Sequence, residues 1–139
     1  MEKKIIGFTS GVFDMFHIGH LNILKQAKDK CDYLIVGVST DECVKSYKHR
    51  LPIIPFEHRA AIVAAIKYVD EVIPQETMDK LEILKKYHFD IMFHGNEWKN
   101  TPLYNRYEKE FANYGARIEF LKHTDGISSS LLREKIHHD

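Results

Sequence analysis

Five short apolar segments alternate with amphipathic segments along this chain, and this alternation restricts the possible folds more than any other feature. The strand-like segments cover residues 5–9, 33–39, 71–74, 91–94 and 117–122. Segments with helical spacing cover 18–30, 56–68, 78–87, 103–114 and 129–137, with a short helical turn at 41–45. Apolar strands separated by helices are typical of a parallel sheet covered on both faces. We therefore expect one α/β domain over residues 1–139, a Rossmann-like, doubly wound, five-stranded parallel sheet flanked by helices.

Charge and cysteine content narrow the class of protein. Lys and Arg together total 20, as do Asp and Glu, which argues against nucleic acid as the main partner. Cys31 and Cys43 form neither a metal-ligand spacing nor a framework of disulfides, which fits a reducing cytoplasm. The apolar run after Lys3 and Lys4 is only four residues long, too short for a signal peptide or a membrane span. We expect a cytoplasmic enzyme or binding module that does not contact a membrane.

His17 and His20 lie where the first strand-like segment passes through a glycine-containing loop into a helix. Such a junction holds phosphate on free backbone N–H groups and on the helix dipole. Histidines three residues apart share one helix face, so both imidazoles can point at one ligand. Gly19 between them would remove a side chain where a nucleotide approaches. The alternatives are a pair of surface histidines and a zinc site, although cysteine or carboxylate partners at a familiar spacing are lacking.

Three blocks of sequence resemble the cytidylyltransferase family of the HxGH nucleotidyltransferase superfamily. They are Gly-Val-Phe-Asp at 11–14 with His-Ile-Gly-His at 17–20, Glu-His-Arg at 57–59, and His-Thr-Asp-Gly-Ile-Ser-Ser at 123–129. The last block is similar to the family's Arg-Thr-Glu-Gly-Ile-Ser-Thr motif. The resemblance covers nearly the whole chain and is strongest to the bacterial glycerol-3-phosphate cytidylyltransferases.

The resemblance implies transfer of a cytidylyl group from CTP to a small phosphomonoester, with Mg²⁺ as the cofactor and pyrophosphate as the second product. The short chain favours glycerol 3-phosphate as acceptor, so that CDP-glycerol would supply teichoic acid or capsule synthesis. Other acceptors stay open, namely phosphocholine, phosphoethanolamine and polyol or sugar phosphates. An adenylyltransferase and a non-catalytic nucleotide-binding module are further alternatives. A homodimer is also implied.

The resemblance further implies roles for individual residues. His17, His20 and Lys48 are expected to be catalytic, and nearby phosphates would keep the histidines protonated. The expected nucleotide contacts are Thr9, Ser10, Gly11, Val12, Phe13, Asp14, Gly19, Gly95, His123, Thr124, Gly126, Ile127 and Ser128. The expected acceptor contacts are Arg59, Arg50, Asp14 and Trp98, with the Arg59 guanidinium holding the acceptor phosphate bidentately.

Several of these residues also have ordinary structural interpretations. Asp14 could reach a Mg²⁺–phosphate assembly, although an aspartate in a loop more often fixes a turn. Lys48 and Arg50 belong to a basic run that is otherwise a solvated surface. Arg59 could form an ion pair on a helix surface, and Trp98 could cap the core.

Two positions depart from the family pattern. Arginine is usual where His123 stands, so triphosphate binding would lose a permanent cation and rest more on lysines or depend on pH. The family more often has Gly-Asp-Asp-Trp where this chain has Gly-Asn-Glu-Trp at 95–98, so Asn96 puts any role of the first acidic residue in doubt.

Overall fold

The computed structural model describes residues 4–138 and contains one sheet whose strands run in the order β3-β2-β1-β4-β5. All four pairings between neighbouring strands are parallel, which confirms the predicted five-stranded parallel sheet. The strands are β1 (Ile6–Gly11), β2 (Tyr33–Ser39), β3 (Glu71–Gln75), β4 (Ile91–Gly95) and β5 (Arg117–Leu121).

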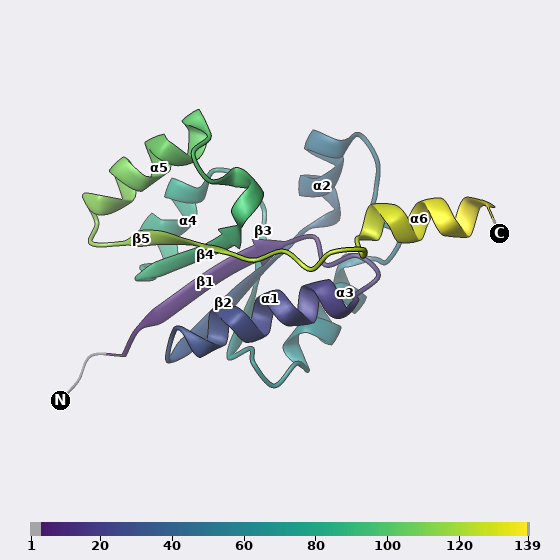
Figure 1. The fold of residues 1–139 in the computed structure, drawn as a ribbon, viewed down its shortest axis with the longest axis horizontal. Coiled ribbons are helices and arrows are strands. Elements are labelled where there is room, and N and C mark those ends of the chain that lie inside the picture. Colours follow the sequence, from purple (N-terminus) through teal and green to yellow (C-terminus); the bar gives the residue numbers. More distant parts are fainter. Residues whose placement is uncertain (1–3, 139) are drawn as a thin grey trace.

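Helices cover both faces of the sheet, as a doubly wound fold requires. Figure 1 shows α1 and α3 on one face, α4 and α5 on the other, and α2 and α6 toward the end where the strands point. The helices are α1 (Ile18–Asp29), α2 (Asp41–Lys48), α3 (Phe56–Ala64), α4 (Lys80–Tyr87), the 3-10 turn η1 (Asn96–Trp98), α5 (Pro102–Ala112) and α6 (Ser129–His138). None of the helices within residues 4–138 is long and apolar enough to cross a membrane.

The two faces of the sheet carry separate hydrophobic clusters. Phe8 of β1 and Met92 of β4 pack in one cluster with residues of α4 and α5. Val36 of β2 and Phe93 of β4 pack in the other cluster with residues of α1 and α3. Side chains alternate along a strand, so Ser10, two residues beyond Phe8, lies on the α4–α5 face.

Three helix ends differ from the sequence prediction. The short turn expected at 41–45 is a full helix, because the Thr40 hydroxyl accepts a hydrogen bond from the Cys43 N–H and starts α2 firmly. Helix α3 ends at Ala64 rather than at 68, where tight turns lead the chain toward β3. Gly115 was expected to cap α5, but that helix ends at Ala112, and Gly115 adopts a positive φ of 73° in the loop before β5.

The strand order reverses between β1 and β4. In open α/β sheets, ligands bind outside the carboxyl ends of the strands at such a reversal. The loop after β1, the end of β4 and the segment after β5 meet there.

Candidate active site

A cavity of about 270 Å³ opens at the carboxyl ends of β1 and β4. Its walls come from the loop after β1, from α1, from the end of α2, from η1 and from α6. The lining residues are Thr9, Ser10, Gly11, Val12, Phe13, Asp14, His20, Ile23, Lys48, His94, Gly95, Glu97, His123, Ser129 and Arg133. Most of the loop residues named from sequence therefore lie on one cavity, while His17, Gly19 and the segment 124–128 lie behind its wall.

The two histidines are held by the start of helix α1. The His17 backbone N–H donates to Nδ1 of His20 over 3.2 Å, and the Gly19 N–H donates to Nδ1 of His17 over 3.0 Å. The two rings are stacked with centroids 3.8 Å apart. Because each Nδ1 acts as an acceptor, the proton of each neutral ring is on Nε2. The fold thus provides two oriented Nε2–H donors.

Both histidines are uncharged in this arrangement. Burial lowers the pKa of His20 to about 4, with a further contribution from His17 and an opposing one from Asp14. Burial, and then proximity to His123, lowers the pKa of His17. The prediction that these rings are protonated is therefore not supported by the ligand-free geometry, because a proton on Nδ1 would also break the helix cap.

Gly19 has a different reason for being glycine from the one expected. A Cβ at this position would lie 2.8 Å from Cε1 and 3.0 Å from Nδ1 of His17. The missing side chain makes room for the His17 ring rather than for a nucleotide. Gly19 therefore shapes the site indirectly, by letting the ring fold back over the helix start.

Asp14 is a structural anchor, with 1% of its surface exposed. Its carboxylate accepts hydrogen bonds from the backbone N–H groups of Ile53 and Ile54, both at 2.9 Å, and from Arg133 at 3.0 Å. Burial alone would raise the pKa of Asp14, but these hydrogen bonds lower it below its ordinary value. Both carboxylate oxygens are occupied, so the geometry favours the turn-fixing role over that of a metal ligand or an acceptor contact.

The expected role of Arg59 is corrected by the structure. Its side chain is 1% exposed and does not line the cavity. Nε donates to the Ile54 carbonyl, one terminal nitrogen donates to the carbonyls of Val12 and Ser39, and the other pairs with Asp41 at 2.6 Å. With its donors turned to the backbone, Arg59 ties together three segments beneath the site and does not reach an acceptor phosphate.

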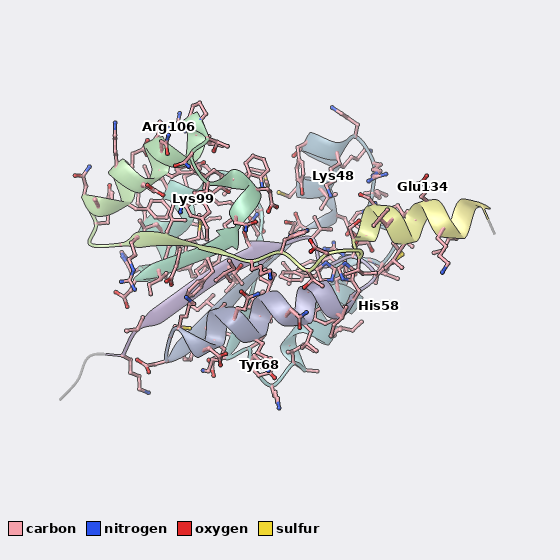
Figure 2. All side chains as sticks on the ribbon, in the orientation of Figure 1. Lys48, His58, Tyr68, Lys99, Arg106 and Glu134 are labelled. Atoms are coloured by element: carbon pink, nitrogen blue, oxygen red, sulfur yellow. The ribbon has the colours of Figure 1, made fainter. Side chains whose placement is uncertain are left out.

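The basic residues at the end of α2 are divided between the cavity and solvent. Lys48, the last residue of α2, lines the cavity, and Figure 2 shows it where α2 ends. Partial burial lowers the pKa of Lys48, as do the charges of Arg133 and Arg50. Arg50 is exposed and does not line the cavity.

The segment after β5 packs against the start of α1. Thr124 Oγ1 accepts a hydrogen bond from Asn22 Nδ2 over 3.0 Å, and the side chain of Ile127 approaches Gly19. Gly126 supplies a positive φ of 80°, which other residues rarely adopt. Thr124, Gly126 and Ile127 therefore fasten this segment over the histidines.

His123 and Ser128 flank that segment and have different positions. His123 lines the cavity, with its Nδ1 3.9 Å from Oε2 of Glu97 across the opening. Ser128 Oγ accepts from the Leu131 N–H over 3.1 Å, which confirms the predicted serine cap of the last helix.

The end of β4 brings a carboxylate into the cavity. The Glu97 side chain folds over Gly95, so a Cβ on this glycine would lie 2.5 Å from Glu97 Oε2. Trp98 is 42% exposed and packs against the rings of His94 and Tyr104 instead of lining the cavity. An acceptor contact by Trp98 stays a prediction.

Sequence reasoning missed three residues at the site. Arg133 extends from α6 into the cavity, one helical turn beyond Ser129, and its position could have been found by continuing the helical spacing past the last motif. His94 also lines the cavity. Lys80 lies under the Ser10 side chain and is the first residue of α4, on the same sheet edge as the motifs.

The fold and this cavity define a nucleotide-binding α/β protein, because imidazole N–H donors, cations and a helix start converge at the point where strand order reverses. The sequence profile of the Cytidylyltransferase-like family matches residues 8–135. The chain belongs to this family and is a nucleotidyltransferase.

Relatives match nearly the full chain. The glycerol-3-phosphate cytidylyltransferase of Bacillus subtilis (strain 168) is 34% identical over 135 residues, covering 96% of this chain and 97% of the relative. The FAD synthase of Thermococcus kodakarensis is 36% identical over 143 residues, covering 97% and 93%. The crystal structure of a lipopolysaccharide core biosynthesis protein from Thermoplasma volcanium superposes with a TM-score of 0.73 at 24% identity, covering 88% of this chain and 98% of that one. This last similarity supports the fold.

Proposed function

We propose that the chain transfers the cytidylyl group of CTP to glycerol 3-phosphate, giving CDP-glycerol and pyrophosphate. The observation that carries the proposal is the pair of Nε2–H donors, His17 and His20, held at the start of α1. The Bacillus subtilis relative, matched over nearly its full length, supports this nucleotide and this acceptor. We further propose that the product feeds the synthesis of a cell-surface polymer, teichoic acid or capsule.

In the proposed mechanism the protein supplies positioning and charge rather than a nucleophile. An oxygen of the acceptor's phosphate, ionised at neutral pH, attacks the α-phosphorus of CTP in line. The bond to pyrophosphate breaks, and the cytidylyl group moves to the acceptor. His17 and His20 donate to phosphate oxygens on which charge builds, while Lys48 and Arg133 bring positive charge from α2 and α6.

The nucleotide is proposed to lie along the loop from Thr9 to Asp14 and the segment 123–128. Backbone N–H groups and small side chains of a loop that leads into a helix are well suited to phosphate oxygens. Gly95 leaves room at the end of β4 once the Glu97 side chain moves aside.

Mg²⁺ is the proposed cofactor, carried mainly by the triphosphate. Mg²⁺ is usually held by one or two carboxylates together with substrate phosphates. Residues 4–138 contain no group of three or more side chains arranged to hold a metal. Since Asp14 is occupied, Glu97 is the carboxylate lining the cavity that is available to the ion. This donor set fits a phosphate-borne ion, which supplies neutralisation of phosphate charge.

An adenylyltransferase acting on a cofactor phosphate is the second candidate. The 36% identity to a FAD synthase favours it, since FAD contains an adenylyl group. The Thr-Asp-Gly-Ile-Ser sequence at 124–128 favours the cytidylyltransferase instead, because it is similar to the motif of that branch.

Pyrophosphate release distinguishes these candidates. The purified protein is incubated with each of the four nucleoside triphosphates and with glycerol 3-phosphate, phosphocholine, phosphoethanolamine, a sugar phosphate or FMN. We expect the highest kcat/KM with CTP and glycerol 3-phosphate, with CDP-glycerol identified by mass. Preferential use of ATP with FMN would support the second candidate, and no release with any pair would leave a nucleotide-binding module.

We also propose a cytoplasmic homodimer. Cys31 and Cys43 are both free thiols, as expected in a reducing compartment. Ile18 at the start of α1 and Leu131 in α6 expose 54% and 51% of their surfaces, which gives an interface apolar area near the site. Sedimentation at micromolar concentration should give twice the chain mass of 16.3 kDa. A monomer would contradict the proposal.

A further inference from the structure

Lys80 is a cation buried beneath the cavity, and nothing in the proposed mechanism so far uses it. The residue is 4% exposed, and its Nζ donates to Ser10 Oγ over 2.9 Å. Within residues 4–138, no carboxylate lies within salt-bridge distance of this ammonium. A buried charge without a countercharge is costly, so its retention needs a reason.

The groups that face Lys80 from neighbouring elements do not neutralise it. They are the Cys43 thiol of α2, the His94 imidazole of β4 and the Tyr107 phenol of α5, whose oxygen accepts from the Lys80 backbone N–H. Burial raises the pKa of Cys43 and lowers that of His94 to about 4, so both are neutral at pH 7. The positive charge under the cavity is therefore uncompensated by the protein.

Ser10 connects this charge to the cavity. An ammonium group donates and cannot accept, so the Ser10 oxygen is the acceptor in the Lys80–Ser10 bond. The serine hydroxyl keeps its own proton for a second partner. Ser10 lines the cavity, so that partner can be a ligand whose oxygen accepts the hydrogen bond.

Ser10 and the histidines belong to different sides of the cavity. Ser10 and His94 project from the sheet on the α4–α5 face, as Phe8 and Met92 do in the same strands. His17 and His20 lie on α1, whose buried residues Leu24 and Ala27 pack on the other face. In-line attack requires the acceptor and the leaving pyrophosphate on opposite sides of the α-phosphorus. If the histidines bind the triphosphate, the Ser10 side is left for the acceptor.

We propose that Ser10, with the Lys80 ammonium beneath it, forms the subsite for the phosphate group of the acceptor phosphomonoester. Ser10 contacts that phosphate, and Lys80 is a positioning residue that directs the serine proton into the cavity and provides the countercharge for a dianion. The inference rests on the proposed function, since it assigns one substrate of that reaction to one side of the cavity.

The test is a set of variants assayed for KM with CTP and with glycerol 3-phosphate separately. Lys80→Met should raise the KM for glycerol 3-phosphate about tenfold to a hundredfold, the effect of one lost charge-assisted hydrogen bond, with the KM for CTP changed less than threefold. Ser10→Ala should raise the same KM about threefold to tenfold. Lys85→Met, an exposed lysine of the same helix, is the matched control and should change neither constant.

The pH dependence separates the positioning role from a merely structural one. Burial lowers the pKa of Lys80 to about 8, so kcat/KM for glycerol 3-phosphate should fall above pH 8 as the ammonium loses its proton. Lys80→Arg, which keeps its charge, should restore the acceptor KM and remove this fall between pH 8 and 9.5. Cys43→Ser, which removes the nearest titrating thiol, should retain the fall.

Each outcome bears on the inference alone or on the function as well. Wild-type protein that releases pyrophosphate, with Lys80→Met and Ser10→Ala both raising the KM for CTP instead, overturns the inference and leaves the function intact. Unchanged constants in Ser10→Ala overturn it even if Lys80→Met does not fold. Wild-type protein inactive with CTP and every phosphomonoester overturns the proposed function, and the inference with it.

Discussion

The histidine pair and the Asp14–Arg59 region adjoin the same loop after β1, yet they use their polar atoms in opposite ways. Each histidine gives one ring nitrogen to the backbone and keeps the other as a donor. Asp14 and Arg59 give nearly all of their hydrogen-bonding capacity to the chain itself. The comparison teaches that the hydrogen-bonding capacity left after folding, more than residue type, separates a group that binds a ligand from one that holds a loop.

The largest expected effect tests the structural half of this comparison. Arg59→Met should lower the free energy of unfolding by about 3–5 kcal/mol, because it leaves the buried acceptors and Asp41 without their partner. Urea denaturation measures the change. The control is His58→Ala, an exposed neighbour on the same helix labelled in Figure 2, which should have little effect. A stable Arg59→Met protein whose only defect is weak acceptor binding would return Arg59 to the binding site.

The functional half predicts a loss of turnover without a loss of stability. His20→Ala should lower kcat by on the order of 10²–10³, the effect of removing one donor to developing charge. His17→Ala should lower kcat similarly or somewhat less, because its ring lies behind that of His20. Steady-state kinetics and urea denaturation are measured on the same preparations. A near-normal kcat in both variants would remove the pair from the mechanism.

Acid should weaken the fold through the buried histidines. The pKa of His20 and of His94 is about 4 in the folded chain, against about 6.5 for an unfolded histidine. Between these values the unfolded chain binds protons that the folded chain does not, so stability is complete above pH 6.5 and falls toward pH 4. The loss should reach on the order of 2–3 kcal/mol per histidine. Below pH 4, protonation of Asp14, whose pKa is lowered, should cost further stability.

Urea denaturation from pH 7 to pH 4 tests this slope. A His94→Gln variant should lose stability less steeply over that range, and His58→Gln, at an exposed position, should follow the wild type. Parallel curves for wild type and His94→Gln would show that His94 is not held neutral by burial.

The smallest expected effect concerns His123 at the cavity opening. Arginine keeps its charge at every working pH, whereas histidine changes charge near neutrality. CTP affinity should therefore weaken from pH 6 to pH 8 about twofold to fivefold more in the wild type than in His123→Arg. Titration calorimetry at several pH values measures it. Identical pH profiles would show that the imidazole does not act through its charge.

The strands and their parallel order could be predicted because long apolar runs leave few alternatives. Helix ends were less accessible, since a single hydroxyl at Thr40 extended α2 beyond its hydrophobic pattern. The cavity could be located from the position of the motifs at strand ends, and Ser10, His20, Lys48 and His123 do line it. What the motifs could not show was direction.

Direction depends on contacts between segments far apart in sequence. Arg59 reads as a helix-surface arginine until the carbonyls of Val12 and Ser39 are placed beside it. Lys80 has no motif at all, and its proximity to Ser10 spans 70 positions of sequence. Patterns of nearby residues do not contain such pairings, because they arise from the crossover between β3 and α4.

Helix α6 completes the cavity without belonging to either hydrophobic cluster of the described chain. Its attachments at the site are polar, from Ser129 to the Asp14 carbonyl and from Arg133 to the Asp14 carboxylate. During synthesis on the ribosome the sheet and both clusters can therefore form before residue 129 has emerged. The last wall of the active site arrives afterwards, so the ability to fold and the ability to catalyse are acquired at different moments in the life of one chain.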